Sequence, residues 1–216
     1  MKKRILLTSL ALLSAASTFT ATNSQENEMS FFITSTGSGD GANIGGLAGA
    51  DAHCASLAEA AGSQGKTWRA YLSAHATESS PNINARDRIG FGPWYNAKGI
   101  QVASNLNNLH SEFMALGKEN SLDENGNQVK GRGDTPNQHD ILTGSSLDGR
   151  TIDDGDHTCN NWTSNDEGTA QVGHFDRTGG GQNPTSWNSA HGSRGCSQAN
   201  LIGTGGNGYF YCFATN

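Results

Sequence analysis

The sequence predicts a single, loop-rich domain that contains both α-helices and β-strands. Apolar residues recur at helical spacing in two segments, 47–61 and 106–116, and at strand spacing in several others. Glycine supplies 29 of the 216 residues, about twice its usual share of ~7%. A chain of this length can bury one sizeable core. With so much glycine, its loops must be ordered by specific contacts.

The first seventeen residues have the features of a secretory signal. Residues 2–4 are basic, residues 5–13 are mostly apolar, and residues 14–17 are small enough for cleavage. The apolar run is shorter than the ~20 residues that span a bilayer, and no later segment approaches that length. We therefore expect a signal peptide at 1–17, a flexible spacer at 18–29 and the folded domain at 30–216. The protein would be secreted, periplasmic or displayed on the cell surface.

The charge balance argues against nucleic acid and anionic membranes as partners. Three of the 14 basic residues lie in the expected signal, which leaves 11 against 20 acidic residues and a net charge of about −9. Binding to nucleic acid requires basic residues that neutralise phosphates, and anionic membrane surfaces attract basic segments. We expect an extracellular protein or glycan as partner, no nucleic acid and no membrane insertion.

The elements of the first half follow from periodicity. Residues 31–35 read as an opening strand. From residue 47 a helix should extend to Gly62, which is a natural C-terminal stop. Residues 66–73 alternate at period two and predict a half-buried strand. The inward face of the helix consists of Leu47, Ala50, Cys54, Leu57, Ala58 and Ala61.

The second half contains fewer periodic segments. A second helical face is formed by Leu106, Leu109, Phe113 and Leu116, and Gly117 should end it. The stretch 140–163 joins a short apolar strand signal to a Gly-punctuated acidic loop, Cys159 and Trp162. Residues 168–194 are rich in Gly, Asn and Ser, and 208–213 read as a terminal strand. Trp68, Trp94 and Trp162 are the tryptophans expected in the core.

Four cysteines in an exported chain indicate two disulfides, for which three pairings exist. A zinc site is the rival use of four cysteines, but their spacing contains no C-x-x-C pair. Pairing Cys54 with Cys212 and Cys159 with Cys196 would nest one loop within the other.

A series of short motifs follows in order along residues 30–216. They are Ala50-Asp51-Ala52-His53-Cys54, Trp68-Arg69-Ala70-Tyr71-Leu72-Ser73, Gly92-Pro93-Trp94, Leu142-Thr143-Gly144-Ser145, Asp148-Gly149, Cys159-Asn160-Asn161-Trp162-Thr163, Cys196 and Tyr209-Phe210-Tyr211-Cys212. This order resembles the C-type-lectin-like fold, and within it endostatin domains and the bacterial leptospiral endostatin-like family. The resemblance implies an α+β domain with two amphipathic helices around mixed antiparallel sheets, nested disulfides and paired first and last strands. The long second-half loops would form the ligand surface, and bacterial relatives are associated with host matrix proteins and complement regulators.

The second-half loops contain candidate residues for a calcium site and for a sugar site. The triplets Thr135-Pro136-Asn137 and Trp187-Asn188-Ser189 lack the carboxylates with which C-type lectins bind calcium. Calcium could instead bind the acidic loop. The simpler interpretation is that the acidic residues of this loop form turns exposed to solvent. A sugar could stack on Trp187 and bond to Asn183 and Asn188, unless Trp187 packs beneath its own loop. The candidate calcium ligands are Asp148, Asp153, Asp154 and Asp156, of which the last three are also candidate ligand-binding residues.

No pattern predicts a catalytic centre. The sequence has no G-x-S-x-G elbow, and its seven histidines contain no H-E-x-x-H motif and no close pair. We therefore expect a secreted, non-enzymatic module without a required cofactor. It would recognise an extracellular protein or matrix ligand, and the alternative is a carbohydrate-binding lectin, with or without calcium.

Overall fold

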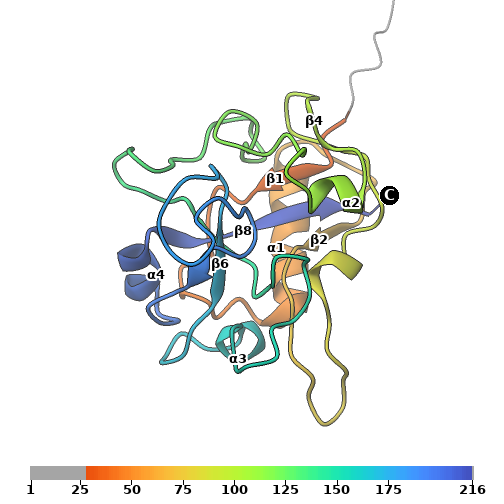
Figure 1. Cartoon of the computed structure of the whole chain (residues 1–216). Helices are drawn as coiled ribbons and strands as arrows, with labels where there is room; N and C mark the ends of the chain where they lie inside the picture. The colour runs from red at the N-terminus through yellow and green to blue at the C-terminus, as the bar shows by residue number, and fades with distance from the viewer. Residues whose placement is uncertain (1–27, 216) are drawn as a thin grey trace, which may run out of the picture.

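A computed structural model describes residues 28–215, so the expected signal peptide and most of the expected spacer lie outside the described residues. A six-stranded sheet is organised around the long strand β8 (Gly206–Ala214), which crosses the middle of the molecule (Figure 1). Strands β1 (Phe31–Ile33) and β2 (Trp68–Ala70) both pair antiparallel with β8. The expected pairing of the first and last strands is confirmed.

The other side of the sheet comes from the second half of the chain. Strand β5 (Asp140–Leu142) pairs parallel with β8 and antiparallel with β6 (Gln171–His174). Strand β7 (His191–Gly192) then pairs antiparallel with β6. The fold is therefore mixed α+β. A separate two-stranded sheet consists of β3 (Trp94–Tyr95) and β4 (Gln101–Ala103).

Two hydrophobic layers pack on opposite faces of the central sheet. Residues of β8 alternate between them, so Phe210 and Cys212 join one layer while Tyr211 and Phe213 join the other. Burial on both faces explains why the strand reads as a nearly continuous apolar run. Trp68, Trp94 and Trp162 are all buried, as expected.

Helix α1 (Gly46–Ala60) covers one of these faces. Its buried positions are Ala50, Cys54 and Ala58, and Gly62 adopts a positive φ of 87° just beyond its end. Cys54 bonds to Cys212 of β8, and Cys159 bonds to Cys196. The nested pairing is confirmed. Within residues 28–215, no helix is long and apolar enough to cross a membrane.

The second expected helix is much shorter than its pattern predicts. Helix α2 spans only Leu106–Leu109, after which the chain turns so that the Ala115 N–H donates to the Val102 carbonyl of β4 (2.9 Å). Phe113 therefore does not lie on an inward helical face and is 89% exposed. Backbone pairing with β4 overrides the local periodicity.

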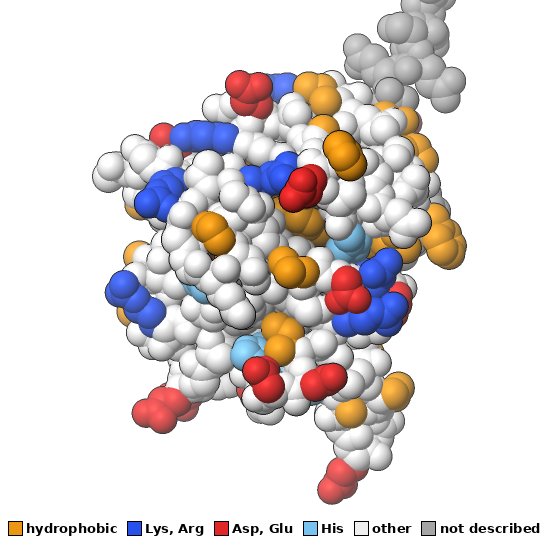
Figure 2. All heavy atoms as spheres, in the orientation of Figure 1, with side chains coloured by type: hydrophobic (Ala, Val, Ile, Leu, Met, Phe, Trp, Pro, Cys, Tyr) orange, Lys and Arg blue, Asp and Glu red, His pale blue; other side chains and the backbone are white. Residues whose placement is uncertain are grey.

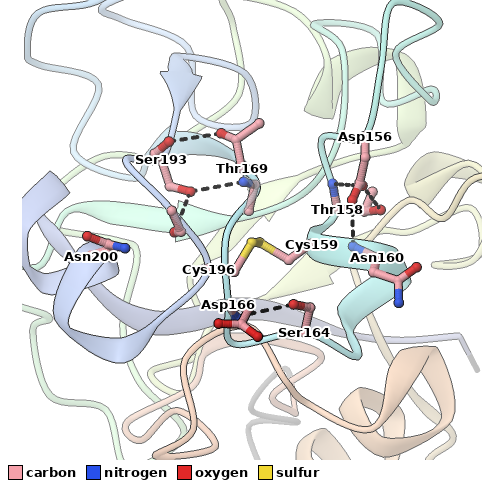
Figure 3. The surroundings of a disulfide bond; sticks show 12 residues. Asp156, Thr158, Cys159, Asn160, Ser164, Asp166, Thr169, Ser193, Cys196 and Asn200 are labelled. Atoms are coloured by element: carbon pink, nitrogen blue, oxygen red, sulfur yellow. Dashed lines mark hydrogen bonds between the residues drawn. A yellow bond between two sulfur atoms is a disulfide. The ribbon is translucent and has the colours of Figure 1, made fainter.

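The remaining helices are short. A 3-10 turn spans Ala85–Asp87, and α4 (Gln198–Thr204) leads directly into β8. Segment α3 (Cys159–Trp162) is a left-handed turn, because all four residues have φ between 49° and 67°. Around the Cys159–Cys196 disulfide, the Asp156 carboxylate accepts hydrogen bonds from Thr158 and from the Asn160 backbone (Figure 3). These contacts hold a conformation that L-residues avoid.

Candidate functional site

A buried cluster of three histidines and two aspartates lies where β5, β6 and β7 meet. Asp140 begins β5 and stands opposite His174, the last residue of β6, in the antiparallel register. His139 precedes Asp140, and His191 enters from β7, where it pairs with Val172. Strand pairing therefore unites residues that lie up to 52 positions apart in the sequence.

The side chains converge on one carboxylate oxygen. Oδ1 of Asp140 lies 3.2 Å from Nε2 of His139, 3.2 Å from Nε2 of His174 and 3.7 Å from Nε2 of His191. The Nε2 atoms of His174 and His191 are 3.0 Å apart. The rings of His139 and His174 stack with centroids 4.2 Å apart.

The other ring nitrogens contact groups outside this centre. Nδ1 of His139 lies 3.1 Å from the Asp176 carboxylate. Nδ1 of His174 lies 2.8 Å from the Pro184 carbonyl, and Nδ1 of His191 lies 3.1 Å from its neighbouring Gly192 carbonyl. A carbonyl accepts only from an N–H, so the proton of His174 and that of His191 lie on Nδ1 in the neutral rings. Their Nε2 atoms then present lone pairs to the centre.

Because the cluster is buried, its charged groups interact strongly and shift the pKa values of His174 and Asp176. Asp140 is only 2% exposed, and neither of its carboxylate oxygens accepts a hydrogen bond in the structure. Burial disfavours protonation of His174, but Asp140 and the Pro184 carbonyl outweigh it and raise its pKa. Burial also opposes ionisation of Asp176, but His139 and the Arg132 N–H lower its pKa to about 2.

A glycine loop lies directly over the rings. A Cβ on Gly179 would come within 2.4 Å of Cε1 of His174, and one on Gly181 within 2.7 Å of Cδ2 of His191. Only glycine permits this approach without displacing the imidazoles. The loop thereby covers the cluster.

Among the described residues, His139, Asp140 and His174 form the group whose ligand atoms could hold a metal ion, and His191 lies beside it. The sequence prediction missed this site, because it found no close pair of histidines and read 168–194 as a loop. No local sequence signal could have found it, because only the antiparallel pairing of β5 with β6 places Asp140 opposite His174.

Close to this cluster, two shallow hollows open on either side of Leu147, Gln182 and Asn183, which line both. We call the first the loop groove. It has a volume of about 420 Å³ and is bounded by the loop after α2, the loop after β5 and the loop between β6 and β7. Figure 2 looks onto this face, where hydrophobic side chains lie among acidic and basic ones. Its lining includes His110, Glu112, Met114, Leu147, Arg177, Gln182, Asn183 and Trp187.

The residues expected to contact a sugar contribute differently from the prediction. Trp187 lines the groove but is only 3% exposed, because its ring packs against Tyr71, His110 and Tyr211. Asn188 is buried, and its amide lies within hydrogen-bonding distance of Tyr71 Oη and two loop carbonyls. The Asn183 amide donates to the Ser189 carbonyl. The stacking surface on Trp187 that the sugar hypothesis needs is therefore covered.

The acidic loop does not converge on one point. Asp148 bonds to Ser146 and Arg150, and Asp156 caps the left-handed turn. Asp154 pairs with His157, and Asp153 is exposed. Within residues 28–215, these four aspartates are not grouped as ligands of one ion.

Comparison with known proteins assigns no family to this chain. The chain matches no family model and no curated protein. The fold and the site define a disulfide-stabilised α+β domain with a buried His–Asp cluster and an adjoining groove. The likeness to endostatin-like domains stays a prediction.

Proposed function

We propose that this chain is an exported, non-enzymatic domain that binds an extracellular protein through the loop groove. The observation that carries the proposal is a pair of large apolar side chains left in solvent beside a hollow. Leu147 lines the groove and is 54% exposed, while Phe113, between the lining residues Glu112 and Met114, is 89% exposed. Exposed apolar groups beside a concave surface are typical of protein-binding sites.

The composition of the groove also favours a protein ligand. Leu147 provides apolar contact beside the buried Met114 and Trp187, while Glu112 and Arg177 add opposite charges to the lining. An apolar centre with a polar rim is the usual anatomy of a protein interface. A sugar site would instead need an exposed aromatic face, and Trp187 is covered.

The floor of the groove is held by buried bonds. The Tyr71 hydroxyl lies 2.7 Å from Nε2 of His110. The Asn188 amide donates hydrogen bonds to this hydroxyl and to the carbonyls of Ser146 and Leu147. These contacts tie together three loops that are distant in sequence. A surface that is ordered before binding loses less conformational entropy when it binds.

Binding to a panel of purified extracellular-matrix proteins, measured by biolayer interferometry beside a glycan array, tests the proposal. We expect calcium-independent binding to at least one matrix protein. Phe113→Ser and Leu147→Asp should each weaken it at least tenfold. The matched control is Phe91→Ser, because Phe91 is 84% exposed and, unlike Phe113, has no sequence neighbour in the groove lining.

Two outcomes would contradict the proposal. Equal losses for Phe91→Ser and Phe113→Ser would show a nonspecific hydrophobic effect instead of a groove. Binding only to glycans, with affinity that depends on added calcium, would establish the lectin alternative.

A further inference from the structure

We propose that His139, Asp140, His174 and His191 bind one divalent transition metal ion of the zinc class in tetrahedral geometry. Such a site goes beyond ligand recognition by the groove and does not depend on it. The four side chains come from the start of β5, the end of β6 and β7, so the sheet itself builds the site.

The spacing of the donor atoms matches a tetrahedral ion. Zinc binds imidazole nitrogen and carboxylate oxygen at about 2.0–2.1 Å, which places neighbouring ligand atoms about 3.3 Å apart. The contacts of Asp140 Oδ1 with the three Nε2 atoms are 3.2, 3.2 and 3.7 Å, and the His174–His191 contact is 3.0 Å. Four of the six donor separations therefore bracket the expected value. His191 lies outside the group whose ligand atoms are all within 4.8 Å of one another, so its ring must move toward the ion to complete the tetrahedron.

The protonation of the donors also favours a cation. The carbonyl contacts at Nδ1 leave lone pairs on the Nε2 atoms of the neutral His174 and His191 rings, and these atoms lie 3.2 and 3.7 Å from Asp140 Oδ1. Asp140 is buried, and both of its oxygens lack a hydrogen-bond donor. When the rings are neutral, these lone pairs and the carboxylate repel one another in a buried site, and a bound metal ion replaces that repulsion with metal–ligand bonds.

The ligand types indicate which ion. Calcium and magnesium prefer six or more oxygen ligands or water, whereas three imidazoles and one carboxylate suit zinc and its neighbours. The outer contacts fit as well, because His139 contacts the Asp176 carboxylate and His174 donates to a backbone carbonyl. Such partners orient metal-binding histidines.

Four protein ligands and a glycine loop over the rings describe a closed, structural site. The loop from β6 to β7 carries His174 and His191 at its ends, and its residues 182–188 form one wall of the loop groove. An ion would fasten both ends of this loop to Asp140. The metal should therefore protect residues 177–189 from proteolysis.

The test uses the mature chain with its disulfides intact and without a polyhistidine tag. We expect elemental analysis after zinc loading and desalting to find one zinc per chain. Cobalt(II) should give the intense visible absorption of a tetrahedral site, displaced by zinc. His174→Ala and His191→Ala should each lower zinc affinity at least tenfold in competition with a chromophoric chelator. Asp176→Asn should lower it 10- to 100-fold while keeping the one-to-one stoichiometry, as expected of a positioning residue.

His157→Ala is the matched control, because His157 forms a histidine–aspartate pair with Asp154 outside the cluster. It should retain one zinc at unchanged affinity. Asp140→Asn separates binding from folding: its melting temperature should equal or exceed the wild type in chelator, yet rise less on adding zinc. Circular dichroism confirms the fold of each variant. Less than half an equivalent of zinc in the wild type, loss of zinc in His157→Ala alone, or stabilisation by calcium and not zinc would overturn the proposal.

Discussion

The side-chain amide of Asn188 lies 3.0 Å from the hydroxyl of Tyr71, although 117 positions separate the two residues. The same amide nitrogen lies 3.0 Å from the Ser146 carbonyl and 3.2 Å from the Leu147 carbonyl. One buried group therefore joins the segment after β2, the loop after β5 and the loop before β7. This junction holds the floor of the loop groove.

Asn188→Ala should lower the free energy of unfolding by about 1–3 kcal/mol, because it leaves the Tyr71 hydroxyl and two carbonyls with one partner fewer. Urea denaturation measures the change. Asn165→Ala is the control: Asn165 is exposed and bonds to Asp40 on the surface, so its effect should stay within ~0.5 kcal/mol. Equal effects of the two substitutions would show that the junction contributes nothing.

The Cys159–Cys196 disulfide closes a loop with a sequence separation of 37. Replacing both cysteines by alanine should cost roughly 2–4 kcal/mol, because the unfolded chain gains conformational freedom. The effect should fall below the value for an isolated loop, since Cys54–Cys212 encloses it. Urea denaturation of the double variant checks this, and a loss below ~0.5 kcal/mol would contradict it.

Asn160 lies in the left-handed turn with a φ of 55°. Asn160→Gly should leave stability unchanged or raise it, whereas Asn160→Val should lower the unfolding free energy by about 1–2 kcal/mol. The control is Asn165→Gly, because Asn165 is not among the positive-φ residues of the described chain. Glycine there should destabilise slightly through backbone entropy. Thermal melts of the three variants measure the contrast, and stabilisation by Asn160→Val would refute it.

Asp156 makes the stability contributed by the left-handed turn depend on pH. Burial opposes ionisation of this carboxyl, but hydrogen bonds from Thr158 and Asn160 outweigh it and lower its pKa. A lowered folded-state pKa stabilises the protein above the unfolded pKa of about 3.9, and this contribution is lost as pH falls through the folded value. Asp156→Asn should therefore destabilise most above pH ~5 and less below pH ~3. Denaturation at several pH values tests this, and a difference independent of pH would contradict it.

Gly179 and Gly180 provide a matched pair over the histidine cluster. A Cβ at Gly179 would meet His174 at 2.4 Å, whereas one at Gly180 would meet nothing within 4 Å. Gly179→Ala should weaken zinc binding at least tenfold and lower stability by about 1–3 kcal/mol, as overpacking does. Gly180→Ala should change neither by more than ~0.5 kcal/mol. Equal zinc affinities for the two variants would show that the loop does not position His174.

Much of the framework could be predicted because its signals are local. Helical spacing around Cys54 predicts α1, and the aromatic run before Cys212 predicts β8. The nested disulfides follow from the resemblance to endostatin-like domains. The second helix was overestimated, because spacing alone cannot show that residue 115 bonds to β4. Phe113 consequently moved from the expected core to the surface.

The sequence by itself predicted an export signal, an α+β framework and two disulfides. These features depend on propensity, periodicity and composition, which are properties of neighbouring residues. Only the tertiary structure brought together the histidine–aspartate cluster. His139, His174 and His191 carry no shared motif, and they meet because β5, β6 and β7 pair in one register. Trp187, whose ring the sequence suggested as a stacking surface for a sugar, is likewise buried in the structure. Register and burial depend on the whole chain, and no local pattern encodes them.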